Sequence, residues 1–189
     1  MPTTPPILTT ARLVLRMATN DDIPGIIHYY TANHEHLAPF SQRRPADFLT
    51  EHYWQQVIAK SYDDFATDRS LRLVLFDSSK PQQMIGEVNF NNFVRGAAQF
   101  CHLGYGIDAG YQGGGYMTEA LQAAIRYVFD ELHMHRVMAN YLPHNQRSGK
   151  VLRRLGFVVE GYARDYLLID GAWQDHILTS LINPSWTPA

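Results

Sequence analysis

The part of the sequence that most restricts the possible folds is a glycine-rich stretch that joins a predicted strand to a predicted helix. Residues 100–108 are apolar and β-rich, and glycines follow at positions 110, 113, 114 and 115. Apolar side chains then recur at helical spacing, at Met117, Leu121, Ala124, Ile125, Val128 and Leu132. Glycine lets backbone N–H groups approach a ligand closely, and a helix N-terminus attracts phosphate. The stretch therefore predicts a strand–loop–helix unit suited to a pyrophosphate, although a glycine-rich turn without a ligand would read the same way.

Hydrophobic periodicity predicts that helices and strands are mixed along the chain. Strands are predicted at 12–17, 69–76, 84–93, 100–108, 136–142, 157–169 and 173–181, and helices at about 20–32, 47–62, 117–132 and 145–155. Residues 34–45 are predicted as a loop, and Asp170-Gly171 as a hairpin turn. We expect an α+β fold with a central mixed, twisted β-sheet of about seven strands, flanked by about four helices. The expected boundaries are a flexible N-terminus over 1–10, one domain over 11–183 and a C-terminal tail over 184–189.

Composition argues against several classes of protein. The chain has 189 residues, with 16 Lys and Arg against 18 Asp and Glu. Dedicated nucleic-acid binders usually carry a basic excess, so no direct nucleic-acid binding is expected. The single cysteine, Cys101, rules out an internal disulfide and a Cys₂-type zinc site, and we expect it to be a small buried side chain. No apolar run approaches the length of a membrane span and Met1–Thr10 is not a secretory signal, so a soluble, cytoplasmic protein without membrane contact is expected.

Three known phosphate-binding patterns compete for the glycine-rich stretch. The P-loop pattern fails because the one Gly-Lys pair, at 149–150, is followed by valine. The Rossmann fingerprint fails because Ala109 occupies its third glycine position. The third pattern, Q/R-x-x-G-x-G/A, is the acetyl-CoA loop of the GCN5-related N-acetyltransferases (GNAT). Gln112-Gly-Gly-Gly-Tyr-Met117 resembles it at the glutamine and at Gly115, and departs from it at Met117.

A second motif downstream strengthens this resemblance. Asn145-Gln-Arg-Ser148, followed by Val151-Leu-Arg-Arg-Leu-Gly-Phe157, resembles the N-x-x-S…LGF element of the same superfamily. Residues 138–149, 160–171 and 175–176 resemble most closely the Rim enzymes, in the subtype that acetylates the N-terminal alanine of a small-subunit ribosomal protein. The resemblance implies the GNAT fold, acetyl-CoA as co-substrate with no metal, and direct attack of an α-amine on the thioester. The implied partner is the N-terminus of a ribosomal protein, with the ribosome itself as a further candidate.

The resemblance also assigns residues to the co-substrate. The phosphates would lie against the amides of the glycine-rich loop, and the pantetheine arm between the strands that end at Asp108 and start at Arg136. A main-chain amide of residues 106–107 would point at the thioester oxygen. The implied cofactor-binding residues are Gly106, Ile107, Gln112, Gly113, Gly114, Gly115, Tyr116, Met117, Thr118, Asn145 and Ser148. Asn145 could instead serve only as a helix cap, and the cations Arg147, Lys150, Arg153 and Arg154 either approach the 3′-phosphate or form a solvated helix face.

Two residues are candidates for proton handling. Many GNAT enzymes carry a tyrosine where this chain has Leu152, whereas Ser148 resembles the serine of Rim-type enzymes and would hydrogen-bond the departing thiolate. A capping hydroxyl is the alternative for Ser148. Glu87, in the middle of a predicted strand and expected by alternation to point to the opposite side from Val88, would take a proton from the amine through water, unless it is merely an exposed strand residue. An α-amine has a pKa of about 7.8 and lysine about 10.4, so an enzyme with a weak base serves an α-amine better.

The acceptor is expected to bind between the loop 34–45 and the last hairpin. The candidate substrate-binding residues are Phe40, Arg43, Tyr162, Tyr166, Trp173 and Asp175. Ordinary packing is the alternative for the aromatic ones. The close pairs His34/His36 and His133/His135 lack a further ligand at metal-binding spacing, so no metal site is expected.

Two other functions stay open at this point. One is a GNAT acetyltransferase of a small-molecule amine, such as an antibiotic or a polyamine. The other is a CoA-binding ribosome-assembly factor with little catalysis, which the leucine at position 152, in place of the family's tyrosine, keeps open.

Overall fold

One mixed β-sheet runs through residues 4–188, the part of the chain that the computed structural model describes. Its eight strands lie in the order β1-β2-β3-β4-β5-β6-β8-β7. The strands are β1 (Ile7–Thr9), β2 (Leu13–Arg16), β3 (Leu71–Asp77), β4 (Lys80–Val94), β5 (Phe100–Ile107), β6 (Arg136–Tyr141), β7 (Val158–Ile169) and β8 (Ala172–Ile182). The α-helices are α1 (Ile23–Ala32), α2 (His34–Leu37), α3 (Glu51–Ala66), α4 (Tyr116–Asp130) and α5 (Gln146–Arg154). Neighbouring strands are antiparallel except β5 and β6, which are parallel.

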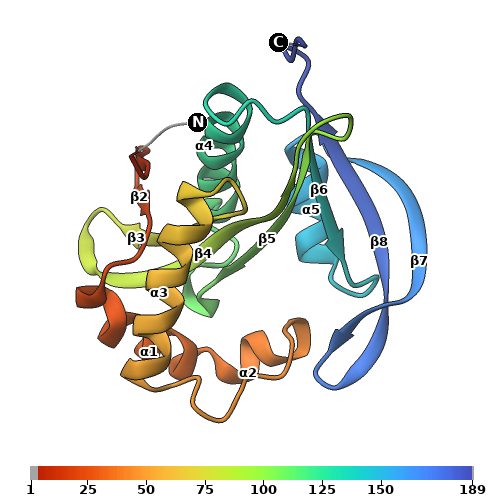
Figure 1. Ribbon diagram of the computed structural model, residues 1–189. Helices are drawn as coiled ribbons and strands as arrows, with labels where there is room; N and C mark the ends of the chain where they lie inside the picture. Colours follow the sequence, from red (N-terminus) through yellow and green to blue (C-terminus); the bar gives the residue numbers. More distant parts are fainter. Residues whose placement is uncertain (1–3, 189) are drawn as a thin grey trace.

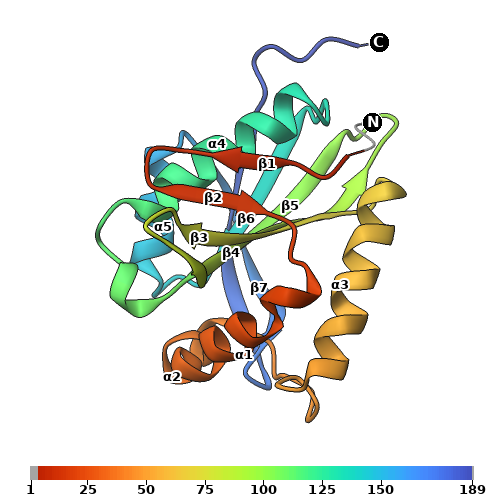
Figure 2. The same ribbon diagram turned by 90° about the vertical axis from the view of Figure 1, so that its left-hand side faces the viewer.

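The helices divide between the two faces of the sheet (Figures 1 and 2). The apolar stripe of α4 packs on one face together with Leu152 of α5 and Val88 of β4. On the other face, α1 and α3 enclose a second cluster around Tyr30 and Trp54. We refer to these as the α4–α5 face and the α1–α3 face. Because each face is covered by different helices, the direction of a strand side chain decides which cluster it joins.

Local sequence signals explain where several elements begin and end. Thr50 caps α3 by accepting a hydrogen bond from the Tyr53 amide, 3.2 Å away. Gly156, at φ +90°, ends α5 in the left-handed region that glycine adopts readily. Cys101 is fully buried, as expected from the sequence, and burial raises the pKa of its thiol to about 12. None of the helices in the described part of the chain has the length and hydropathy needed to cross a membrane.

The structure has the expected mixed α+β sheet, with one strand and one helix more than the sequence predicted. β1 lies inside the segment 1–10 for which a flexible terminus was expected, and it forms a short antiparallel ladder with β2. α2 and a 3-10 turn at Ala38–Phe40 replace much of the predicted loop 34–45. Helix α3 begins at Glu51 rather than at residue 47. Three- and four-residue elements are too short to display a period, so hydrophobic periodicity misses them.

The separation of the two parallel strands is the feature of the fold that positions the site. Pairing between β5 and β6 begins at Phe100 and Arg136 and ends at Leu103 and Ala139. Beyond that pair, residues 104–107 of β5 stay paired with β4 only. The sheet therefore opens between β5 and β6 beside the glycine-rich loop that follows β5.

Candidate active site

The opening between β5 and β6 presents main-chain groups of known direction. The Asp108 amide donates to the Ile85 carbonyl of β4 at 2.8 Å. In a regular antiparallel ladder the direction of N–H and C=O groups alternates along the strand, so the main-chain groups of Gly106 also face β4. Those of Tyr105 and Ile107 face the opening. The register thus turns the predicted Ile107 amide toward the expected pantetheine arm, and turns the predicted Gly106 amide away from it.

The glycine-rich loop has the backbone that an anion-binding turn requires. Gly113 and Gly115 have φ values of +77° and +81°, and Gly115 is the N-cap residue of α4. Met117, the departure from the acetyl-CoA loop pattern, is only 7% exposed and packs into the core of the α4–α5 face. Its side chain therefore points away from the loop surface, and the amides before α4 stay accessible to a phosphate. The predicted loop residues Gln112–Thr118 thus form one turn at the N-terminus of α4.

Arg12, directly before β2, holds this loop in place. Its Nη1 donates to the Gly114 carbonyl at 2.9 Å, its Nε donates to Glu119 at 2.7 Å, and its guanidinium lies 4.1 Å from the centre of the Tyr116 ring. Thr10 adds a hydrogen bond to Glu119 at 2.6 Å. Partial burial opposes the effect, but these hydrogen bonds from Thr10 and Arg12 lower the pKa of Glu119. No local sequence pattern identifies Arg12 as a contact of this loop, because it lies 102 positions from Gly114 in the chain.

Helix α5 closes the same opening on the α4–α5 face. Asn145 Oδ1 accepts from the Ser148 amide at 3.1 Å, so Asn145 caps α5, and its contact with the pantetheine arm stays a prediction. A Cβ at Gly149 would lie 2.9 Å from the Tyr141 ring, which shows how closely α5 approaches β6. The Ser148 Oγ lies 2.7 Å from the hydroxyl of Tyr105 on β5. Strand alternation predicts that Tyr105 points away from the face of its neighbours Gly104 and Gly106, and that signal could have identified it.

Gln112 connects the loop to helices on both sides of the opening. Its amide oxygen accepts a short hydrogen bond from Arg147 of α5, and its amide nitrogen lies 2.8 Å from His36 Nε2 of α2. Arg147 is thus the member of the predicted cation group that reaches the co-substrate loop. Lys150, Arg153 and Arg154 are exposed on α5.

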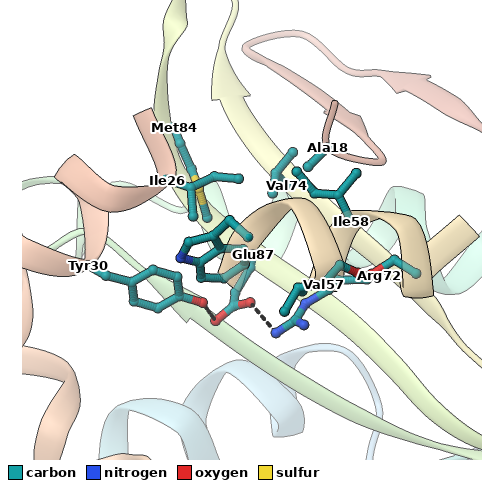
Figure 3. A pocket seen from close by; sticks show the side chains of 11 residues that line it. Ala18, Ile26, Tyr30, Val57, Ile58, Arg72, Val74, Met84 and Glu87 are labelled. Carbon is teal, nitrogen blue, oxygen red and sulfur yellow. Dashed lines mark hydrogen bonds and ion pairs between the residues drawn. The ribbon is translucent and has the colours of Figure 1, made fainter. Parts of the chain in front are cut away.

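Glu87 faces the opposite side of the sheet, as alternation with buried Val88 predicted. Its carboxylate accepts hydrogen bonds from the Tyr30 hydroxyl at 2.7 Å and from the side-chain Nδ2 of Asn89 at 2.9 Å. Arg72 Nη2 lies 3.6 Å from Glu87 Oε2, and Figure 3 shows the tyrosine and the guanidinium converging on the carboxylate in a small pocket. Burial, followed by the neighbouring Glu87 charge, raises the pKa of Tyr30 well above its usual value. Tyr30 therefore remains a neutral hydrogen-bond donor to Glu87.

Several polar atoms on the α1–α3 side of the central strands are buried without a hydrogen-bond partner in residues 4–188. They are Tyr29 Oη, Trp54 Nε1, Asn89 Oδ1, His102 Nδ1 and Asn140 Oδ1. A Cβ at Gly106 would lie 3.4 Å from the Tyr29 hydroxyl, and one at Gly104 would meet no described atom within 4 Å. Burial lowers the pKa of His102, which favours its neutral form. Because unpaired buried polar groups are costly, these atoms are candidates to bind a polar substrate.

The predicted acceptor-binding residues divide into two groups. Tyr166 shares the α1–α3 face with Asn140, whose amide lies 3.5 Å from its hydroxyl. Phe40 packs against His144, and Arg43 lies 3.7 Å from Asp170 in the β7–β8 turn. The remaining three, Tyr162, Trp173 and Asp175, lie on the other face of the β7–β8 hairpin. There the Tyr162 hydroxyl donates a hydrogen bond to the Asp175 carboxylate, and this bond lowers the pKa of Asp175. The structure therefore does not gather all six residues into one groove.

The described residues contain no group of three or more His, Cys, Asp or Glu side chains that could hold a metal ion.

Comparison with known proteins gives a consistent result. The family profile described as "Acetyltransferase (GNAT) domain" matches residues 12–158. The "[Ribosomal protein uS5]-alanine N-acetyltransferase" of Escherichia coli K12 is 46% identical over 181 residues, which cover 96% of this chain and 93% of the relative. A crystal structure of the ribosomal-protein-S5-alanine acetyltransferase from Vibrio fischeri superposes with a TM-score of 0.92 at 37% identity, over 97% of this chain and all of the other. Mycobacterium smegmatis RimJ in complex with CoA-disulfide has a TM-score of 0.85 at 25% identity, over 98% and 89% of the two chains.

Proposed function

Because this chain belongs to the GNAT acetyltransferase family, we propose that it transfers the acetyl group of acetyl-CoA to the α-amine of the N-terminal alanine of ribosomal protein uS5. The similarity to the Escherichia coli enzyme of that name extends over nearly the whole length of both chains, which supports this acceptor. The observation that carries the chemistry is the opening between β5 and β6. It has the glycine-rich loop at its end, Ser148 on one face of the sheet and Glu87 on the other. A ribosomal acceptor implies action in the cytoplasm.

The residues around the opening fit acetyl-CoA without a metal. The amides of Gly113–Met117 would hold the phosphates, since the three glycines of the loop are exposed and the Met117 side chain is buried. The main-chain groups of Tyr105 and Ile107 would hydrogen-bond the pantetheine arm and the thioester oxygen. Arg147 and Gln112 would close over the arm from α5 and the loop.

In the transfer, the nitrogen of the neutral α-amine forms a bond to the thioester carbonyl carbon, and the carbon–sulfur bond breaks with its electron pair going to sulfur. Glu87 would accept the proton that the bound α-ammonium gives up to become this neutral amine, directly or through one water, and the proton left on the nitrogen after the attack passes to solvent. Ser148 would hydrogen-bond the departing thiolate, which takes a proton from solvent. Tyr30 and Arg72 hold the Glu87 carboxylate in place from two sides.

The acceptor's first residues would lie on the α1–α3 face. There the unpaired Tyr29, Asn89, His102 and Asn140 atoms would meet the polar groups of an extended peptide. Gly104, where a Cβ would meet no described atom within 4 Å, leaves room above β5 for the alanine and its amine. We place Phe40, Arg43 and Tyr166 at the rim of this surface.

The experiment is acetyl transfer from labelled acetyl-CoA to matched peptides. The first has the uS5 N-terminal sequence starting with alanine, the second starts with serine, and the third has a blocked N-terminus and an internal lysine. We expect transfer to the alanine peptide and none to the blocked one. Transfer only to the lysine peptide would overturn the proposed acceptor. Transfer only to a polyamine or another small amine would establish the small-molecule alternative. Tight acetyl-CoA binding with no transfer to any amine, including folded uS5, would favour the assembly-factor alternative.

A further inference from the structure

Two hydroxyl groups meet beside the opening between β5 and β6. The Tyr105 hydroxyl lies 2.7 Å from Ser148 Oγ and 3.4 Å from the Ser148 carbonyl oxygen. Residues 4–188 offer the phenol no hydrogen-bond partner other than these two atoms of Ser148. Tyr105 was not among the residues that the sequence motifs assigned to the site.

The chemistry of the two groups sets the direction of their hydrogen bond. A phenol is more acidic than an aliphatic hydroxyl, and so it is the better donor, whereas the serine oxygen is the better acceptor. Either hydroxyl could donate in the short contact on geometry alone, and on this chemical ground we assign Tyr105 as the donor to Ser148 Oγ. With one lone pair engaged in this way, Ser148 keeps its own proton free for another acceptor.

We propose that Tyr105 is a positioning residue that holds Ser148 as a hydrogen-bond donor to the sulfur of the thioester. This inference rests on the proposed acetyl transfer and adds to it the residue that orients the serine. If the phenol were absent, the serine hydroxyl could rotate toward main-chain carbonyls of its own helix, which is the usual partner of a helical serine.

The protonation state of the phenol agrees with this role. Burial raises the pKa of Tyr105 to about 12, even though its hydrogen bond with Ser148 acts in the opposite direction. Tyr105 therefore stays neutral at physiological pH and donates a hydrogen bond without transferring its proton. The proton balance of the reaction is unchanged, since the amine proton leaves through Glu87 and the thiolate is protonated from solvent.

The backbone of Ser148 is held independently of Tyr105. The Asn145 side chain caps the Ser148 amide, and the neighbouring Gly149 packs against Tyr141. Removing the phenolic oxygen should therefore change the orientation of the serine hydroxyl while leaving α5 in place. This separation allows a test in which a general loss of structure and a loss of thiolate stabilisation give different results.

The test compares Tyr105→Phe with the wild type on two acetyl donors, acetyl-CoA and its selenoester analogue. A selenolate is a much weaker base than a thiolate and leaves without a hydrogen-bond donor. With acetyl-CoA, we expect kcat to fall roughly fivefold to tenfold, the worth of one hydrogen bond. With the selenoester as donor, Tyr105→Phe and the wild type should have the same kcat. Equal losses with both donors, or no loss with acetyl-CoA, would overturn the proposal.

Two further variants support the comparison. Ser148→Ala must show the same dependence on the donor, and adding Tyr105→Phe to it must cause no further loss, because the two hydroxyls act as one unit. Tyr127→Phe is the matched control, since Tyr127 on α4 also has a buried hydroxyl, with no partner in the described residues. It should behave as the wild type. The two donors are compared with whichever amine the wild-type enzyme acetylates or, where it acetylates none of those tested, in the hydrolysis of the donor by water. A lack of transfer to the alanine peptide therefore counts against the proposed acceptor and not against the role of Tyr105.

Discussion

At the scale of single residues, alternation along one strand separates the two halves of the proposed reaction. Tyr105 reaches Ser148 on the α4–α5 face, whereas Gly106, directly opposite Glu87 in the ladder, faces α1. Tyr105 and the two glycines beside it, which border the surface proposed for the amine, thus face opposite sides of the sheet. The reacting thioester is expected between them, at the edge of β5.

Glu87→Gln tests the amine side of this arrangement. At pH 7 we expect kcat/KM for the alanine peptide to fall roughly 100-fold, because the amide cannot accept the amine proton. The difference in kcat/KM between Glu87→Gln and the wild type should shrink as the pH rises above about 7.8, where most of the free α-amine is already neutral in solution. The measurement is a pH profile of kcat/KM for both proteins.

The control for this variant is Glu131→Gln, at an exposed position after α4. It removes the same charge away from the site and should leave the profile unchanged. A Glu87→Gln deficit that stays constant between neutral and alkaline pH would contradict the role of Glu87 as proton acceptor.

At the scale of elements, the register of β4 against β5 sets the position of one side of the opening. Gly86 lies opposite Ile107, and a Cβ on Gly86 would lie 2.5 Å from the Gly106 carbonyl oxygen and 3.3 Å from Ile107 Cα. These are backbone atoms, which cannot rotate away as a side chain can. Close contact of the two backbones at Gly86 therefore holds the Ile107 amide at the edge of the opening.

Gly86→Ala should displace β5 at this point. We expect the free energy of unfolding to fall by about 1–3 kcal/mol, as for other overpacked sites, and the Kd for CoA to rise. Gly161→Ala is the control, because Gly161 is also in a strand and a Cβ there meets nothing within 4 Å in the described residues. Urea unfolding and calorimetric titration with CoA measure both effects. If the two variants had the same free energy of unfolding and the same Kd for CoA, the close contact at Gly86 would not be what holds β5 in place.

At the scale of the whole molecule, the N-terminal helices and the C-terminal hairpin meet across the α1–α3 face. The Asp170 amide donates to the Ser41 carbonyl at 2.9 Å, and Arg43 packs against the same turn at Gly171. Figure 1 shows the segment after α2 reaching the tip of the β7–β8 hairpin. This contact between distant parts of the chain bounds the surface that we assign to the acceptor.

Arg43→Ala should weaken this boundary without touching the co-substrate loop. We expect the KM for the alanine peptide to rise roughly twofold to fivefold, the effect of one exposed ion pair, with the Kd for CoA unchanged. Arg126→Ala, which removes an exposed cation from α4, is the control and should change neither constant. Steady-state kinetics with varied peptide checks this. A rise in the Kd for CoA, or no change in the KM for the peptide, would argue against an acceptor surface at this boundary.

The sequence by itself determined the order of the main strands and helices, the glycine-rich turn before α4, the burial of Cys101 and the side of the sheet that Glu87 faces. All of these follow from local periodicity or from the backbone preferences of glycine, which act within a few residues. Only the tertiary structure decided where β5 and β6 separate, which tyrosine meets Ser148, and that Tyr30 and Arg72 surround Glu87. Each of these depends on strand register and helix packing between residues far apart in the chain, and no local pattern records such contacts.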